Sequence, residues 1–318
     1  MRYIVFSDLH SNLEALNQFE KEISSISYDR LVCLGDIVGY GAEPNACVDW
    51  VRRNVDFTLA GNHDLAVVDK TNYSYFNKYA LEACVWTQKM LTAENRKFLE
   101  SLPLDREEDG IYWVHASPFE PKRWHYIYNK IGAEKHFLNF DVPLCFVGHS
   151  HKPIILEQNP KGEINDYVSD LWVVDPKNRY IFNDGSLGQP RDGNPKPTYI
   201  FYDTDERTVE FKRFDYDFSK TQKHIIENGK LKIVKMTRED KFIENDMDYS
   251  SWNFACKQFT ALFNWSGNPG ASIPSGFTKY NMPVGLQIVG AKENEVGVLQ
   301  ASRVFELEKP WQNKRPII

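Results

Sequence analysis

Short apolar runs that end on acidic, imidazole or amide side chains recur through the first 151 residues of the chain. The first run, Tyr3 to Phe6, leads to Asp8 and His10. Each run predicts a short buried strand. Because open α/β sheets bind ligands beyond the carboxyl ends of their strands, we expect the side chains at these ends to meet. The polar residues at the five ends are Asp8, His10, Asp36, Asn62, His63, Asp64, His115, His149 and His151.

The pair Asp8 and His10 has two interpretations when taken alone. Extended backbone places residues i and i+2 on the same side, so the two side chains can converge on one point, either as a metal site or as an ordinary polar loop. Four further run ends with metal-competent side chains favour the metal site. Glycines beside them let the backbone turn sharply and approach a bound group closely, at Gly35, Gly61 and Gly148.

The spacing of apolar residues alternates between strand and helix. Strands are predicted at 31–34, 56–60, 111–114 and 142–147, with helices at 12–26, 44–53 and 73–101 between them. This βαβ order predicts neighbouring strands with helical crossovers, and we expect all five run ends to belong to the same sheet. Shorter strands with turn formers between them, typical of antiparallel pairing, then follow at 153–157, 172–174, 180–182, 199–203 and 209–214, before a last helix at 218–227.

Composition narrows the class of protein. The 318 residues carry a net charge of -6, which argues against a strong nucleic-acid-binding surface. There is no apolar run long enough for a membrane span and no signal peptide is expected. Five cysteines are scattered without a CxxC pair, as in a reduced cytoplasmic protein. If the substrate is an anion, the positive charge that attracts it must be local.

In order and spacing, the polar motifs resemble those of the calcineurin-like metallophosphoesterase family, and more closely its small bacterial and archaeal phosphodiesterase-like members. The resemblance covers about residues 1–229, and no ligand position is replaced. It implies an α/β fold, a four-layer αββα sandwich of two mixed sheets. The motifs that carry it are Asp8-x-His10, Gly35-Asp36, Gly61-Asn62-His63-Asp64, His115 and Gly148-His149-Ser150-His151.

The resemblance implies two divalent metal ions about 3.5 Å apart. One ion would be held by Asp8, His10 and His151, and Asp36 would bridge it to the other. The second ion would be held by Asn62, His115 and His149. Imidazole and carboxylate ligands suit Mn²⁺, Fe or Zn²⁺ better than Ca²⁺. We expect Mn²⁺, with Fe, Zn²⁺ and Ni²⁺ as alternatives.

The implied activity is hydrolysis of a phosphate ester by a hydroxide that bridges the two ions. His63 would donate a proton to the leaving oxygen or stabilise charge, Asp64 would orient it, and Asn62 would touch both metal and phosphate. Arg191 has two interpretations, a substrate contact or a surface ion pair. Phosphate monoesters, diesters, nucleotides and dinucleoside polyphosphates are all candidate substrates. The rival from another class is a non-catalytic metal-binding scaffold for protein interactions.

The chain after residue 229 departs from this pattern. Residues 230–251 are charged and predict a linker, and residues 252–318 resemble the C-terminal end of the amidase-signature family. That resemblance rests on Phe259 to Phe277, Met282 to Gly290 and an amphipathic helix at 293–308. The family's Ser-Ser-Lys catalytic machinery is missing, so amidase activity is not expected. The segment, with two predicted strands and a helix, has three interpretations. It is a small α+β appendage, an oligomerisation element, or the product of a gene rearrangement or frameshift.

Overall fold

The computed structural model describes residues 1–73, 76–227, 270–277 and 283–289. The chain divides into two units, Met1–Val234 and Lys235–Ile318. In the described ranges, the first unit contains two six-stranded sheets with helices, and the second contains a two-stranded sheet.

The first sheet is organised around the N-terminal strand. β1 pairs in parallel with β2 and antiparallel with β11, so Val5 lies between Val32 and Ile200. β3 continues the parallel side, and β12 and β9 continue the antiparallel side. In spatial order the strands are β3 (Phe57–Thr58), β2 (Arg30–Cys33), β1 (Arg2–Phe6), β11 (Thr198–Asp203), β12 (Thr208–Arg213) and β9 (Leu171–Val173).

The second sheet is also mixed. Its centre is the parallel run β5, β6 and β10, and antiparallel strands complete both edges. Two of its strands were not predicted, because β4 and β8 are largely polar and exposed on both faces. In spatial order the strands are β4 (Asp105–Glu108), β5 (Ile111–Val114), β6 (Leu144–Val147), β10 (Arg179–Asn183), β7 (Ile154–Gln158) and β8 (Ile164–Tyr167).

The expectation of a single sheet for all five run ends is therefore wrong. The first three follow β1, β2 and β3 of the first sheet, whereas His115 and the pair His149 and His151 follow β5 and β6 of the second. Local periodicity identifies a strand but not its partner. The polar hairpin strand β4, which opens the second sheet, carries no apolar signal that would have marked the change.

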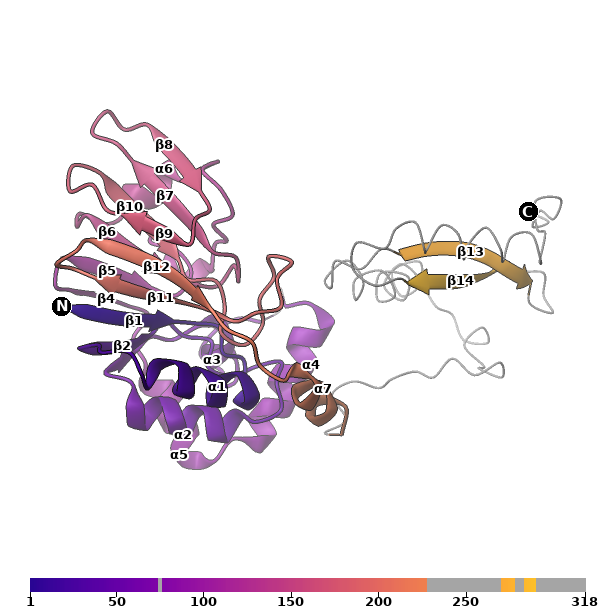
Figure 1. The fold of residues 1–318 in the computed structure, drawn as a ribbon. Helices are drawn as coiled ribbons and strands as arrows, with labels where there is room; N and C mark the ends of the chain where they lie inside the picture. Colours follow the sequence, from indigo (N-terminus) through magenta and orange to yellow (C-terminus); the bar gives the residue numbers. More distant parts are fainter. Residues whose placement is uncertain (74–75, 228–269, 278–282, 290–318) are drawn as a thin grey trace. The chain divides into compact units, whose positions relative to one another are not determined.

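Three apolar clusters define the predicted four layers. Phe6 on β1 packs with Leu16 and Val48 of the helices that cover the first sheet. Trp113 and other apolar residues of both sheets fill the space between them. Phe137 packs on the outer face of the second sheet. The αββα sandwich of two mixed sheets is thus confirmed, with most helices on the side of the first sheet (Figure 1).

The helices predicted for the first unit are present, whereas α3 (Asn62–Ala66) and α6 (Glu134–Phe137) were not predicted. Asn12 caps the first helix through the backbone N–H of Ala15 at 3.2 Å, and Thr92 caps the helix that begins at Ala93. The predicted helical region 73–101 contains two helices, α4 and α5. The helices are α1 (Leu13–Ile23), α2 (Pro44–Asn54), α3 (Asn62–Ala66), α4 (Lys78–Met90), α5 (Ala93–Ser101), α6 (Glu134–Phe137) and α7 (Phe218–Glu227), with a 3₁₀ turn, η1, at Pro121–Arg123.

In the second unit, β13 (Gly270–Phe277) and β14 (Pro283–Val289) form an antiparallel hairpin with Gly270 opposite Val289. Both strands were predicted. The predicted linker at 230–251 and helix at 293–308 lie outside the described residues.

Two bulk properties of the described residues bear on function. Their four cysteines are free thiols and are buried, at Cys33, Cys47, Cys84 and Cys145. None of the described helices is long and apolar enough to cross a membrane.

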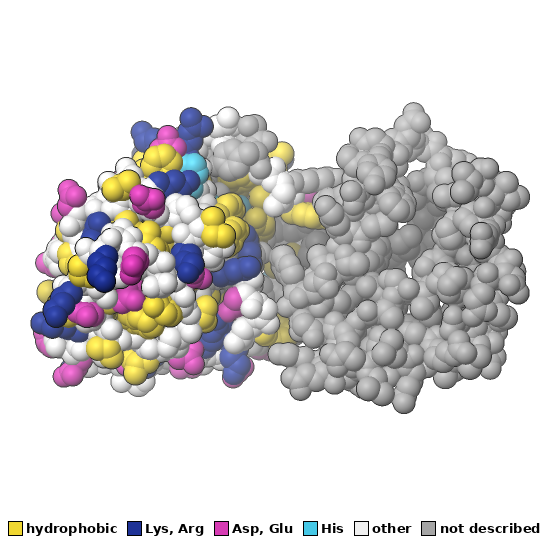
Figure 2. Space-filling model, turned by 90° about the horizontal axis from the view of Figure 1, so that it is seen from above, with side chains coloured by type: hydrophobic (Ala, Val, Ile, Leu, Met, Phe, Trp, Pro, Cys, Tyr) yellow, Lys and Arg dark blue, Asp and Glu magenta, His cyan; other side chains and the backbone are white. Residues whose placement is uncertain are grey.

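Figure 2 shows one face of the first unit, on which basic, acidic and apolar side chains are interspersed. A mixed surface of this kind provides little long-range attraction for an anion.

Candidate metal centre

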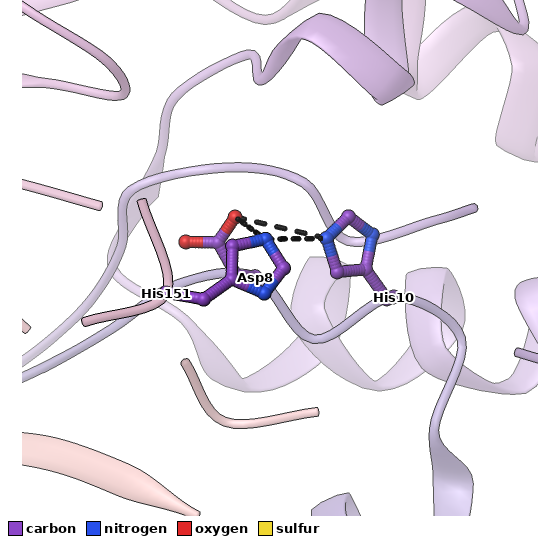
Figure 3. Close-up of side chains that lie close together, drawn as sticks. All are labelled: Asp8, His10 and His151. Atoms are coloured by element: carbon purple, nitrogen blue, oxygen red, sulfur yellow. Dashed lines mark hydrogen bonds and ion pairs between the residues drawn. The ribbon is translucent and has the colours of Figure 1, made fainter. Parts of the chain in front are cut away.

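In the described part of the chain, three groups of buried side chains at the strand ends could hold a metal ion, and the group of His10, Asp36 and His63 overlaps the other two. Asp8, His10 and His151 form the first of those two (Figure 3). Asp8 Oδ1 lies 3.1 Å from His151 Nε2 and 3.7 Å from His10 Nε2. The two Nε2 atoms are 3.1 Å apart. Three potential ligand atoms therefore point at one another inside the protein, which is the arrangement that a cation between them would satisfy.

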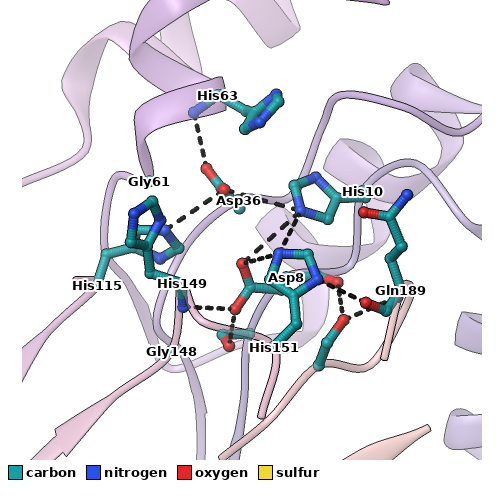
Figure 4. Close-up of polar contacts among 12 residues, drawn as sticks. Asp8, His10, Asp36, Gly61, His63, His115, Gly148, His149, His151 and Gln189 are labelled. Atoms are coloured by element: carbon teal, nitrogen blue, oxygen red, sulfur yellow. Dashed lines mark hydrogen bonds and ion pairs between the residues drawn. The ribbon is translucent and has the colours of Figure 1, made fainter. Parts of the chain in front are cut away.

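Asp36, His115 and His149 form the second group. Asp36 Oδ2 lies 3.4 Å from His115 Nε2 and 3.8 Å from His10 Nε2 (Figure 4). One carboxylate oxygen thus faces both groups. This is the position from which Asp36 could share two ions.

In all four histidines of these two groups, the ring nitrogen away from the carboxylates lies next to a backbone carbonyl oxygen. When the ring is neutral, such a contact fixes the tautomer, because that nitrogen carries the proton and the other is left as a lone-pair donor. His149 uses Nε2 for this contact and so offers Nδ1 to the centre. The contacts are His10 Nδ1 to Val38 at 3.0 Å, His115 Nδ1 to Leu34 at 3.0 Å, His149 Nε2 to Trp124 at 3.0 Å and His151 Nδ1 to Gln189 at 2.5 Å.

Each carboxylate is oriented in a similar way. Asp8 Oδ2 accepts hydrogen bonds from the Ser7 hydroxyl at 2.5 Å and the backbone N–H of His149 at 2.8 Å. Asp36 Oδ1 accepts from the backbone N–H of His63 at 2.8 Å. The second oxygen of each carboxylate is left facing the centre.

Five of these six residues have left-handed backbone. Their φ angles are 51° for Asp8, 48° for His10, 53° for Asp36, 65° for His149 and 57° for His151. This conformation is strained for residues other than glycine and tends to occur at functional sites. The convergence of Asp8 and His10 is confirmed, but the extended backbone inferred for it is wrong, because β1 ends at Phe6 and the chain then turns.

Two glycines leave room for the carboxylates. A Cβ on Gly61 would lie 2.1 Å from Asp36 Oδ1, and a Cβ on Gly148 would lie 2.2 Å from Ser7 Oγ and 2.7 Å from Asp8 Oδ2. No larger residue fits at either position without moving a carboxylate.

The titration of the group follows from burial and mutual attraction. Burial opposes charge on Asp8, but the combined attraction of His151 and His115 lowers the pKa of Asp8. In the same way, His115 and His63 hold the pKa of Asp36 well below its usual value. Burial lowers the pKa of His115, but the surrounding carboxylates, with Asp36 first among them, together raise it to about 9. Burial lowers the pKa of His10, and that of His149 to about 3. Neutral His10 and His149 are in the form that binds a metal.

The structure also places the three predicted residues of the Asn62-His63-Asp64 motif, in the first turn of α3. Asn62 Oδ1 is buried. The His63 ring packs 4.9 Å from that of His10, and burial lowers the pKa of His63 to about 4. Both hydrogen bonds accepted by the Asp64 carboxylate come from backbone N–H groups, of Val38 at 3.1 Å and Gly61 at 3.0 Å. Asp64 therefore holds the loops around His63 rather than its imidazole.

Arg191 lies in the loop after β10. Its backbone N–H donates to the carbonyl of His151 at 3.0 Å, and its guanidinium donates to Gln189 Oε1 at 2.7 Å and lies 5.6 Å from the centre of the Tyr40 ring. Among the described residues it forms no ion pair, so the surface ion pair considered for it is not present. His125, by contrast, pairs with Glu120 at 3.0 Å, outside the centre.

Two residues that support the centre escaped the sequence analysis. Ser7 Oγ lies between Asp8 Oδ2 and Asp184 Oδ1, at 2.5 and 2.7 Å. A hydroxyl has one proton to donate, so the second contact requires a protonated carboxyl. Burial raises the pKa of Asp184 well above its usual value, which meets that requirement. Ser7 precedes a candidate ligand, but nothing local connects Asp184 to it across 177 positions.

The residues fit a metal centre on two further grounds. Asp8 Oδ1, Asn62 Oδ1 and His115 Nε2 are buried and form no hydrogen bond with any residue that the structure describes. Buried polar atoms of this kind normally have a partner. The donor set of imidazole, carboxylate and amide is also one that transition metals accept.

Comparison with known proteins identifies the family. The calcineurin-like phosphoesterase family model matches residues 1–153. An uncharacterised protein of Methanocaldococcus jannaschii is 40% identical over 228 residues, which cover 70% of this chain and 91% of the relative. The crystal structure of a metallophosphoesterase from Sphaerobacter thermophilus is 39% identical, with a TM-score of 0.64 over 72% of this chain and 95% of that one. The chain belongs to the calcineurin-like phosphoesterases.

Two further similarities are narrower. A hypothetical protein of Pyrococcus horikoshii shares the fold, with 18% identity and a TM-score of 0.58 over 73% of this chain and 94% of that one. A glutamyl-tRNA(Gln) amidotransferase chain of Thermodesulfovibrio yellowstonii is 40% identical over 60 residues. That match covers 19% of this chain but only 12% of the relative, so the amidase resemblance of the C-terminal segment is limited to a short stretch.

Proposed function

We propose that this phosphoesterase hydrolyses phosphate mono- or diesters with two divalent metal ions held in the buried centre. The observation that carries the proposal is the position of Asp36 Oδ2, which faces His115 Nε2 of one group at 3.4 Å and His10 Nε2 of the other at 3.8 Å. Two three-residue groups that meet at one carboxylate oxygen are what a shared pair of ions requires.

In this proposal the residues divide as the family resemblance implies. Asp8, His10 and His151 hold one ion, and Asn62, His115 and His149 hold the other, with Asp36 between them. The unpaired Oδ1 of Asn62 supports its inclusion. Imidazoles with two carboxylates suit transition metals, and the proposal takes Mn²⁺, with Fe, Zn²⁺ and Ni²⁺ as alternatives. When bound, the ions would supply an activated water near neutral pH and would neutralise charge on the phosphoryl oxygens.

His63 is proposed to donate a hydrogen bond to the substrate rather than to act as a cationic acid. Its pKa of about 4 means that the ring is neutral at pH 7, and a neutral imidazole still carries one N–H. The backbone N–H of His63 is tied to Asp36, so its ring is held beside the centre. Arg191 is proposed to bind the substrate, since its charge contributes to the low pKa of His63 and its guanidinium pairs with no carboxylate of the described chain.

The test uses bis(p-nitrophenyl) phosphate with Mn²⁺ on the full-length chain. We expect p-nitrophenolate release that is abolished by metal removal and restored by Mn²⁺. His63→Ala should lower kcat about a hundredfold or more while metal content is unchanged, as for loss of one transition-state donor. Asp166→Asn, on the exposed face of β8, is the matched control and should behave as the wild type.

Two results would contradict the proposal. One is a chain that binds no transition metal and hydrolyses no ester of a panel of mono- and diesters, as expected of a non-catalytic scaffold. The other is full activity in His63→Ala, which would remove His63 from the mechanism.

A further inference from the structure

Three stacked rings lead from the candidate metal centre to the surface of the first unit. The ring of His149 lies 4.1 Å from that of Tyr126 at 20°, and Tyr126 lies 5.3 Å from Tyr128 at 4°. His149 is buried, with 4% of its surface exposed, whereas Tyr126 and Tyr128 are 49% and 51% exposed. The stack therefore begins at a residue of the proposed centre and ends in solvent.

Ile127, between the two tyrosines, anchors the segment that carries them. Its side chain is buried and packs on the outer face of the second sheet, whereas Tyr126 and Tyr128 are half exposed. The segment is also anchored at Trp124, whose indole N–H donates to Thr71 Oγ1 at 3.3 Å and whose carbonyl oxygen lies 3.0 Å from His149 Nε2. The rings are thus held in place relative to the centre before any ligand binds.

Positive charge lies beside the rings. Lys152 Nζ is 5.4 Å from the centre of the Tyr128 ring, and the guanidinium of Arg191 is close enough to Tyr126 and Tyr128 to influence both phenols. Half-exposed stacked aromatic rings flanked by cations, next to a centre for phosphate, fit a ligand that is both anionic and aromatic. Ordinary surface tyrosines need not be stacked in line with a buried histidine.

We propose that Tyr128, held at the outer end of the stack by Tyr126, binds the base of a nucleoside carried by the substrate, so that the preferred substrates are nucleotide esters. The inference rests on the proposed function for the place of the phosphate at the centre. Stacking on an aromatic side chain favours any planar base, because every base has a π-face, and so it selects nucleosides over alkyl groups without selecting one base.

Binding tests this directly. Adenosine 5′-monophosphate and ribose 5-phosphate share the phosphate and the sugar and differ in the base. We expect equilibrium dialysis against the full-length, Mn²⁺-loaded chain carrying His63→Ala, in which turnover is suppressed, to show adenosine 5′-monophosphate binding at least tenfold more tightly. The double variant Tyr126→Ala with Tyr128→Ala should reduce that ratio to less than twofold. The double phenylalanine variant should keep it, because the ring and not the hydroxyl stacks.

Two controls separate stacking from folding and from catalysis. Tyr28→Ala removes another exposed tyrosine, in the turn before β2, and should leave the ratio unchanged. In the wild-type background, phosphate release from ribose 5-phosphate, which has no aromatic ring, should change less than twofold in the double alanine variant, and its thermal melting should match the parent. A wild-type chain that hydrolyses neither this ester nor bis(p-nitrophenyl) phosphate would contradict the proposed function and leave the binding ratio to decide the inference.

Equal binding of the two ligands in the parent chain would overturn the inference. So would a ratio that survives the double alanine substitution.

Discussion

The two halves of the buried centre are supported in different ways. We call Asp8, His10 and His151 the Asp8 half, and Asp36, His115 and His149 the Asp36 half. The Asp8 half depends on the loop after β10. Ser186 Oγ donates to the Asp8 carbonyl at 2.8 Å, the Gly188 N–H donates to the same carbonyl at 3.0 Å, and the carbonyl of Gln189 lies 2.5 Å from His151 Nδ1.

The Asp36 half is held mainly by the backbone at the strand ends. His115 Nδ1 lies 3.0 Å from the Leu34 carbonyl at the end of β2, and the Gly148 N–H donates to the His115 carbonyl at 2.8 Å. The first contact joins the ends of β5 and β2 across the two sheets and the second joins those of the neighbouring strands β5 and β6, whereas Ser186 reaches Asp8 across 178 positions. The Asp36 half should therefore tolerate changes in the loop after β10 that the Asp8 half does not.

The largest effect is expected where the halves meet. Asp36→Ala removes the carboxylate that faces both groups, so both proposed ions should be lost, and activity on bis(p-nitrophenyl) phosphate should fall by more than about a thousandfold, beyond the loss of a single stabilising donor. Elemental analysis of the purified chain together with the hydrolysis rate measures this. Two retained ions would show that the halves do not depend on Asp36.

His10→Ala and His115→Ala should separate the halves. Each removes a ligand of one proposed ion, so each variant should keep about one metal ion per chain and lose about a hundredfold or more in activity. Metal content and kcat, measured side by side, give the comparison. The two-centre description would fail if either substitution emptied both sites.

A smaller and one-sided effect is expected from Ser186→Ala. Loss of the hydroxyl that supports the Asp8 backbone should lower the affinity for the ion of the Asp8 half by about 10- to 100-fold, as is usual for outer residues of a metal site. The affinity for the other ion should not change. Titration of the metal-free chain with Mn²⁺ resolves the two affinities. Ser117→Ala, whose hydroxyl donates to the carbonyl of Phe119, is the matched control. Equal weakening of both ions would remove the distinction between the halves.

The smallest effect is expected from Arg191→Ala. The backbone N–H that contacts His151 remains in this variant, so both ions should stay and kcat should be retained, while loss of the guanidinium raises KM about tenfold, or about 1.4 kcal/mol. Steady-state kinetics and metal content check both parts. Loss of metal would instead assign Arg191 a structural role in the Asp8 half.

Much of the fold could be predicted, and the two strands that were missed share a cause. β1, α1, α2 and α7 carry strong apolar periodicity, and their positions were predicted within a few residues. β4 and β8 were missed because Asp105 to Glu108 and Ile164 to Tyr167 are mostly polar strands at sheet edges. Their pairing comes from neighbouring backbone rather than from their own side chains.

The sequence alone determined which side chains are available to the centre. Acid, imidazole and amide groups that follow five separate apolar runs indicate a shared ligand, because few other functions require so many of them at strand ends. The tertiary structure decided how they meet. It divided them between two sheets, turned five of them through left-handed backbone and paired four of the five histidines with a carbonyl oxygen from a different part of the chain. Such contacts join residues far apart in the chain, and local periodicity carries no information about them.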